Sequence, residues 1–253
     1  MRKLEPILWP LALAVALLCA WHLAVVWTAT RVFPSPFDVQ RGLAELMRKG
    51  LLWSYIGDSL FRVSLGYLSA VVLGVPTGLA LGWYPVAAKA VNPVIQMMRP
   101  ISPLAWIPLA IVWFGVGNTA SVFLIFLASF FPIVVASANG VRNVPIMYLQ
   151  AGQNFGLRPA ALLRRVIFPA ALPQILIGLR IALGVAWLVV VAAEMIAVDS
   201  GLGYLVIDSR NAGKRYDLVV AGMLMIGLIG LGLDVGVRRL ETVRSVRWGF
   251  RNE

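Results

Sequence analysis

The chain has 253 residues, of which 60% are hydrophobic and 13% are charged, and its formal net charge is +11. Soluble domains carry about 25% charged residues, and one core of this size cannot bury so much apolar surface, so a soluble globular protein is excluded. The basic residues fall between apolar runs and not in a patch with exposed aromatics. This pattern is typical of membrane topology signals and argues against nucleic-acid binding.

The chain lacks the residues that most metal sites and catalytic centres require. Its only cysteine, Cys19, and its only histidine, His22, lie in one apolar run. These residues supply neither a disulfide, nor a cysteine-based zinc site, nor an HExxH site. A GxxxxGK[ST] phosphate loop is also missing. We therefore expect no catalytic residue, no metal site and no cofactor in this chain, so any ATP chemistry has to come from another chain.

Six apolar runs are long enough to cross a bilayer, which takes about 20 helical residues. They cover residues 7–27, 63–83, 94–116, 120–138, 168–198 and 218–233. Prolines interrupt the third run, and the sixth extends to 237 if Asp234 is tolerated. We predict an all-α integral membrane protein with six transmembrane helices. The first run also fits a signal peptide, but its length and the lack of an A-x-A cleavage pattern favour a retained helix.

The distribution of basic residues predicts that both termini lie in the cytoplasm. With the N-terminus inside, 14 basic residues fall inside and eight outside, which the positive-inside rule prefers. The inner set is Arg2, Lys3, Lys89, Arg99, Arg142, Arg158, Arg164, Arg165, Arg180, Arg238, Arg239, Arg244, Arg247 and Arg251. The outer set is Arg31, Arg41, Arg48, Lys49, Arg62, Arg210, Lys214 and Arg215.

The external segment 28–58 predicts a short amphipathic helix on the outer surface. Ser35, Pro36 and Asp38 form a helix start, and Gly50 supplies a stop. Its apolar face consists of Val39, Leu43, Leu46 and Met47. Covering the bundle and docking a partner are both open roles for this helix.

Small residues recur every fourth position in the second run. Such a stripe lets helix backbones approach closely in lipid, either inside the chain or at a dimer seam. Its members are Gly66, Ala70, Gly74, Gly78 and Gly82.

The inner segment 143–165 predicts a basic helix with an apolar stripe. Gly156, which is free to take a positive φ, precedes this helix and permits a sharp chain reversal. The helix fits either an anionic lipid surface or a cleft on a partner protein. The stripe is Leu162, Leu163, Val166 and Ile167, and the basic residues are Arg158, Arg164 and Arg165.

This inner segment resembles the EAA loop of ABC-importer permeases. That motif reads EAA, three residues, Gly, nine residues, Ile-x-Leu-Pro, and the spacing here matches in full. The sequence departs from it in four letters, with Gln150 for Glu, Gly152 for Ala, Val166 for Ile and Phe168 for Leu. The helix-turn-helix pattern is kept.

Further stretches narrow the resemblance to the nitrate, sulfonate, taurine and bicarbonate branch of that family, over residues 33–241. They are RPISPLAWIP at 99–108, WFG at 113–115, GLRIALG at 178–184, AE at 193–194 and GLGY at 201–204. The resemblance implies a type I, MetI-like permease fold in a single domain, 1–253. That domain would hold an N-terminal helix and external segment in 1–58, a five-helix core in 59–241 and a cytoplasmic coupling loop in 143–169.

The resemblance also implies the partners of the chain. They are a second permease copy (usually identical), two cytosolic ATPase subunits that bind ATP and Mg, and an extracytoplasmic solute-binding protein, all at a bacterial inner membrane. The coupling loop would seat in a groove of the ATPase through Gln150, Ala151, Gly152, Gly156, Leu157, Arg158, Pro159, Leu162, Arg165 and Pro169.

Arg99, Ser102, Trp106 and Glu194 are candidates for the translocation path. Arg99 precedes a proline-broken stretch whose free amides attract anions, and it equally fits an anchor at the inner surface. Trp106 fits packing better than solute binding. Glu194 is an ionisable group within a membrane run and hence a functional candidate; its other interpretation is a helix-end carboxylate, paired with Arg210 or hydrated.

Two further arginines lie within or beside apolar runs. Arg62 and Arg180 are expected to extend toward water at opposite faces.

The sequence thus predicts a non-enzymatic permease subunit that imports a small anion of the sulfonate, taurine, nitrate or bicarbonate type. The alternative is an ion-coupled secondary transporter. Such a protein normally has several intramembrane ionisable groups or two similar halves. Glu194 is the one clear ionisable candidate, and the sequence shows no internal repeat.

Overall fold

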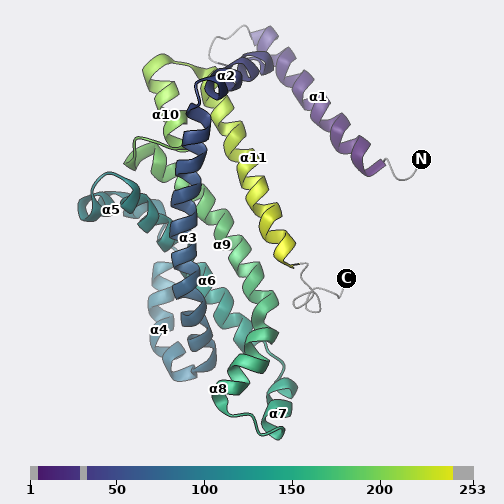
Figure 1. The fold of residues 1–253 in the computed structure, drawn as a ribbon, viewed down its shortest axis with the longest axis vertical. Helices are drawn as coiled ribbons and strands as arrows, with labels where there is room; N and C mark the ends of the chain where they lie inside the picture. Colours follow the sequence, from purple (N-terminus) through teal and green to yellow (C-terminus); the bar gives the residue numbers. More distant parts are fainter. Residues whose placement is uncertain (1–4, 29–32, 242–253) are drawn as a thin grey trace.

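The computed structural model describes residues 5–28 and 33–241, and all regular structure within them is helical (Figure 1). The predicted basic residues Arg2, Lys3, Arg31, Arg244, Arg247 and Arg251 lie outside the described residues. Within the described part, four segments are long and apolar enough to cross a membrane, and a bent pair of helices makes a fifth. A shorter apolar helical stretch, Ala12–Thr28, coincides with the first predicted run. The all-α membrane fold is confirmed, and the six predicted runs are compatible with these segments.

The core of the bundle consists of α3 (Leu51–Trp83), α6 (Asn118–Arg142) and α9 (Phe168–Ala197). These helices lie along the long axis of the molecule in Figure 1, and α11 (Tyr216–Glu241) lies along one side of them. α3 is continuous from Leu51, so the second membrane helix begins 12 residues before the apolar run that predicts it. Helical hydrogen bonding continues through the polar residues because the first turns of α3 pack beneath α2 and α10.

The stripe of small residues on α3 packs against α6. A Cβ atom at Gly66 would lie 2.7 Å from Cβ of Ile125, and one at Gly78 would lie 2.5 Å from both Cβ of Ser137 and the carbonyl oxygen of Val134. These distances leave no room for a side chain. The described chain therefore uses the stripe for its own α3–α6 packing.

The third predicted run is broken, as its prolines indicate. α4 (Pro85–Met98) is followed by η1 (Pro103–Trp106) and α5 (Ile107–Phe114), with a bend of 83° between the two halves. The second half, with α5, projects away from the bundle about halfway along it (Figure 1). Proline disfavours helical backbone in the residue before it and removes an amide donor, so the break falls at residues 99–102.

The predicted external helix is α2 (Pro36–Arg48), which crosses the end of the bundle that also holds α10 (Leu202–Gly213) (Figure 1). Its N-terminus has a capping box, because the Ser35 hydroxyl accepts from the Asp38 amide and the Asp38 carboxylate accepts from the Ser35 amide. Val39 and Leu46 are buried, but Met47, predicted on the same face, is exposed. It is exposed because α2 packs mainly on α11 and only partly on α3.

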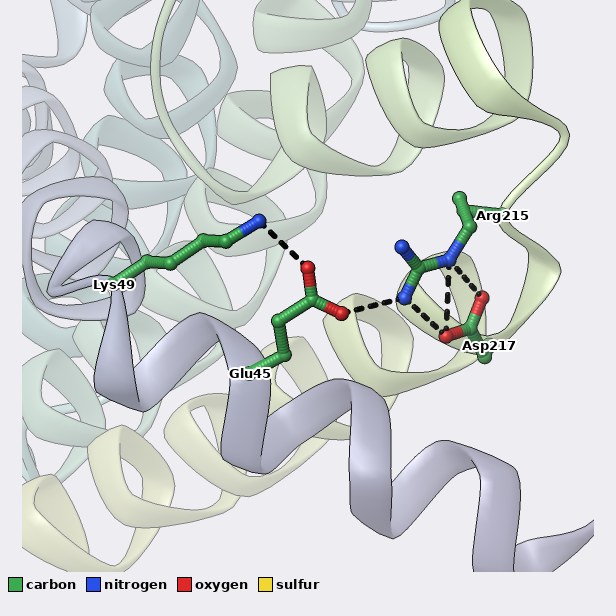
Figure 2. A network of polar contacts seen from close by, with 4 residues as sticks. All are labelled: Glu45, Lys49, Arg215 and Asp217. Carbon is green, nitrogen blue, oxygen red and sulfur yellow. Dashed lines mark hydrogen bonds and ion pairs between the residues drawn. The ribbon is translucent and has the colours of Figure 1, made fainter.

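Ion pairs fasten α2 to the beginning of α11 (Figure 2). Glu45 accepts from Arg215 at 2.7 Å and from Lys49 at 2.6 Å, and Arg215 also contacts Asp217. The two cations lower the pKa of Glu45 to about 2, with Arg215 contributing most. The end of the bundle that holds α2 is therefore stabilised by a charge network as well as by apolar packing.

α1 (Glu5–Thr28) diverges from the bundle in Figure 1 and touches it only near its end. There Trp21 and His22 pack edge-to-face against Phe33 and Phe37. Most of its described side chains are exposed.

Candidate translocation path and coupling surface

The end of the molecule opposite α2 and α10 projects beyond the long helices as a helix-turn-helix. α7 (Ile146–Asn154), α8 (Pro159–Leu162) and η2 (Leu163–Ile167) form it, at the lower end of Figure 1. The sequence predicts one α-helix here, but Leu163–Ile167 forms a π-helical turn. α8, η2 and α9 run together as one apolar helical segment, Pro159–Ala197. A force on the projecting part is therefore applied directly to a core helix.

The predicted chain reversal occurs at Gly156. Its φ is +73°, which glycine adopts freely, asparagine tolerates and most other residues adopt only with strain, and a Cβ atom there would meet nothing within 4 Å. The requirement for glycine is therefore conformational.

The requirement at Gly152 is steric. A Cβ there would lie 2.4 Å from Cδ1 of the buried Leu162. The resembled motif has alanine at this place, and Leu162 occupies the space here.

The projecting segment presents apolar side chains and positive charge together. Ile146, Met147 and Phe155 are exposed, Phe155 by 86%. An open groove beside them is lined by Tyr148, Ala151, Gly152, Phe155, Leu157, Arg165, Val166, Pro169 and Ala170. The predicted basic residues Arg158, Arg164 and Arg165 are exposed, as are Gln150 and Pro159. Leu162 and Ile167 instead face inward, where they hold the segment to α6 and α9.

The break in the third membrane segment opens onto a cavity of about 210 Å³. Arg99 and Trp106 line it, together with Phe131 of α6 and Val185 of α9. Ser102 lies between them and accepts a hydrogen bond from the Leu104 amide, which caps η1. Of the four path candidates, the structure thus brings Arg99 and Trp106 together, and Ser102 lies in the connecting turn.

Arg99 also lines a second cavity, of about 170 Å³, that continues toward the end of the molecule with α7 and α8. Its polar lining is Asn92, Gln96, Asn139 and Arg142. Sequence reasoning did not select the three amide residues. Sequence spacing identifies Asn92 and Gln96, because they lie seven and three residues before Arg99 and therefore share its helix face.

Glu194 lies apart from these cavities. It is 0% exposed and forms a 2.7 Å ion pair with Arg62, which is 2% exposed. Arg62 also donates to Asn118 and to the Ser200 carbonyl, and the Ser59 hydroxyl donates to Glu194 at 2.8 Å. The network joins α3, α6, α9 and the segment between α9 and α10, at the end of the bundle that holds α2.

Two glycines explain why this carboxylate fits. A Cβ at Gly201 would lie 2.4 Å from Cδ of Glu194, and one at Gly203 would lie 2.2 Å from the Val191 carbonyl oxygen. The Gly203 amide donates to Glu194 at 3.0 Å. The segment Gly201–Gly203 therefore packs directly against the ion pair.

The structure corrects the expectations for several charged residues. Glu194 pairs with Arg62 and not with Arg210, and Arg62 is buried instead of extending toward water. Arg180 binds Asp234 through two hydrogen bonds, which also accounts for an aspartate within α11. The arginines find these partners because neighbouring helices supply carboxylates at the same depth.

The expected topology count changes accordingly. Along the bundle, Arg99 and Arg180 lie beside the middle parts of the core helices and not at their ends, and Arg62 is buried. Without these three, 12 basic residues remain in the inner set and seven in the outer set. The preference for the same orientation remains.

The fold and the site define a class of protein. A helical membrane bundle with a broken central segment, polar cavities along that break and a rigid helical projection at one end is the architecture of an ABC-importer permease. The solved inward-facing structure of the MetNI methionine ABC transporter has the same fold, with a TM-score of 0.66 at 18% identity over 78% of this chain and 96% of that chain.

Sequence comparison identifies the family. Residues 70–244 match the family of binding-protein-dependent transport system inner membrane components, to which this chain belongs. It is 38% identical to the taurine transport system permease protein TauC of Escherichia coli strain K12, over 92% of this chain and 90% of that protein. It is 34% identical to the bicarbonate transport system permease protein CmpB of Synechocystis sp. strain PCC 6803, over 93% and 83% respectively.

Proposed function

We propose that this chain is the permease subunit of an ATP-driven importer for a small oxyanion, working as a pair of identical copies. Membership of the permease family supports the transport role. The relatives are named for taurine, which carries a sulfonate, and for bicarbonate. Both solutes present negatively charged oxygens, so the shared chemistry is an oxyanion.

The observation that carries this proposal is the projecting surface formed by α7 and α8. Its exposed Phe155, Ile146 and Met147 are too apolar for an idle aqueous surface, and the adjoining arginines give it a positive rim. An apolar centre with a charged rim fits a groove on a partner protein better than it fits water. The partner would be a cytosolic ATPase subunit that binds ATP and Mg, one for each permease copy.

The remaining arrangement follows from this docking. α7 and α8 would lie in the cytoplasm, both termini would lie on the same side of the inner membrane, and α2 and α10 would face an extracytoplasmic solute-binding protein. Closure of the ATPase pair would move η2 and α9 as one body, which supports alternating access by rigid-body motion. The alternative of ion coupling is disfavoured, since Glu194 is fully engaged by Arg62 and lies outside both cavities.

The test is purification of the tagged full-length chain from native membranes, followed by mass spectrometry of what stays bound. We expect an ATP-binding subunit and a second permease copy, and ATP hydrolysis by the purified complex. Repeated recovery of the chain alone, in detergents that preserve such complexes, would overturn the proposal in favour of an ion-coupled transporter.

Substitutions at Gly156 test the coupling surface within the same complex. Gly156→Leu and Gly156→Pro are incompatible with the positive φ, so we expect loss of the ATPase subunit and of transport with normal membrane insertion. Gly156→Asn is the matched control because asparagine tolerates this conformation, and it should retain the partner. A complex of full activity with leucine at this position would contradict the assignment.

A further inference from the structure

Arg99 lies at mid-depth in the bundle. It lines its cavity with Phe131, which is 13 residues after the start of α6 at Asn118 and 11 before its end at Arg142. At 1.5 Å per residue, both ends of α6 are therefore roughly 16–20 Å from Phe131. The inner-surface anchor therefore does not describe Arg99.

The Arg99 side chain is exposed on the described chain. No ion pair or hydrogen bond joins it to another described side chain in the way that Arg62 and Arg180 are joined to carboxylates. An arginine at this depth is strongly disfavoured against lipid and normally faces a water-filled space. This face of α4 therefore borders water.

The polar lining continues from Arg99 in one direction only. Gln96 and Asn92 follow it on α4, Asn139 faces them from α6, and Arg142 stands at the inner end. Toward α5 the lining is apolar, with Ile101, Pro103 and Trp106. No described Asp or Glu lines either cavity. The result is a one-sided track of N–H donors between two arginines.

We propose that Arg99 is an anion-binding residue at the midpoint of the translocation path, and that Gln96, Asn92 and Asn139 conduct a small oxyanion from it to Arg142. This inference rests on the proposed function and specifies its solute-binding side chain. Guanidinium and amide N–H groups donate to sulfonate or carboxylate oxygens, and the guanidinium supplies the charge that favours an anion over a cation.

The test uses cysteine chemistry, which does not require the natural solute. Gln96→Cys is introduced into a Cys19→Ser background of the full complex. Its modification rate is measured with 2-sulfonatoethyl methanethiosulfonate, an anion, and with 2-(trimethylammonio)ethyl methanethiosulfonate, a cation. Each rate is divided by that reagent's rate with a small free thiol. A positive charge about 5 Å away in water predicts a preference of about tenfold for the anion.

Three variants in this background assign the preference to Arg99. Arg99→Gln should bring the ratio of rates close to one, and Arg99→Lys should retain it. Lys89→Gln is the matched control, because Lys89 is an exposed cation on the same helix outside both cavities, and it should change nothing.

Equal normalised rates that Arg99→Gln leaves unchanged would overturn the inference, and so would absence of reaction with either reagent. Mass spectrometry of the same preparation tests the proposed function separately. If an ATPase subunit is bound but the two reagents react at equal normalised rates, the anion site is contradicted and the ATP-driven function is not. If the anionic reagent reacts faster in a way that depends on Arg99 but no ATPase subunit is bound, the ATP-driven function is contradicted and the anion site is supported.

Discussion

At the scale of single residues, a buried ion pair is the main feature of the end that holds α2 and α10. Arg62 and Glu194 are removed from water together, and the Ser59 hydroxyl and the Gly203 amide both donate to the Glu194 carboxylate. Breaking such a pair leaves the remaining charge buried and uncompensated. The resulting loss in the free energy of unfolding is larger than the amount that the intact pair contributes. The network is therefore expected to be sensitive to loss of one charge even when side-chain shape is kept.

Glu194→Gln tests this sensitivity. We expect it to lower the free energy of unfolding by about 3 kcal/mol, or the thermal midpoint by roughly 6–12 °C, because Arg62 loses its counter-charge. The measurement is thermal unfolding of the detergent-solubilised protein, followed by tryptophan fluorescence. Asp199→Asn, at an exposed carboxylate nearby, is the control and should leave the midpoint unchanged. Equal midpoints for the two variants would contradict a structural role for the ion pair.

The lowered pKa of Glu45 predicts how α2 and the start of α11 respond to acid. Its folded pKa of about 2 lies below the ordinary value of 4.5, because of Arg215 and Lys49. The ion pairs therefore contribute fully above about pH 4.5 and are lost as the pH falls through about 2. We expect amide exchange in α2, corrected for intrinsic rates, to show progressively easier opening from pH 5 to pH 3. Glu45→Gln and high salt should both reduce this pH dependence. An identical pH profile in Glu45→Gln would show that other groups control it.

At the scale of helices, close approach of backbones determines the bundle. Five small residues on α3 lie one turn apart, and three of them, Gly66, Gly78 and Gly82, face α6 at distances that exclude a side chain. Apolar burial contributes little to helix association in lipid, so contact of this kind is what joins helices there. The same helix carries a glycine outside the contact, Gly57, where a Cβ would meet nothing within 4 Å.

Gly78→Ala and Gly57→Ala form a matched pair on α3. The first places a methyl group 2.5 Å from the Val134 carbonyl oxygen, so the helices have to separate, and we expect destabilisation of about 1–3 kcal/mol. The second removes a helix-interior glycine in open space and should be neutral or stabilising by up to about 1 kcal/mol. Thermal midpoints of the two variants give the comparison. Equal effects of the two substitutions would mean that contact between α3 and α6 is not the reason why residue 78 has to be glycine.

At the scale of the whole molecule, the two ends have different chemistry. The end with α2 and α10 is held by ion pairs that join α2 to the start of α11 and α3 to α9. The end with α7 and α8 is an apolar and basic projection (Figure 1). The polar track from Arg99 runs toward the second end. Ion pairs therefore stabilise one end of the molecule, and the other end exposes apolar and basic side chains.

Cysteine labelling measures which end faces the cytoplasm. In a Cys19→Ser background, Arg48→Cys on α2 and Asn154→Cys on α7 are both at exposed positions. We expect an impermeant maleimide to label residue 48 in spheroplasts and residue 154 only after lysis. The reverse pattern would invert the topology and exclude docking of a cytosolic ATPase on α7 and α8.

The sequence by itself determines the features that depend on neighbouring residues. Apolar run lengths predict where the chain crosses the membrane, Pro100 and Pro103 predict the break, and Gly156 predicts the reversal. In each case the cause acts within a few residues, through backbone dihedral preferences or through the hydrophobicity of one segment.

Only the tertiary structure decides which charges meet and at what depth. Arg62 and Glu194 are 132 residues apart in the chain, and each arginine considered at the sequence level had several equally local interpretations. Pairing depends on how α3, α6 and α9 are placed side by side, and that placement comes from close glycine contacts between helices. For the same reason Arg99 is identified as a mid-depth residue, beside the middle of α6, only once the broken helix is seen against its neighbour.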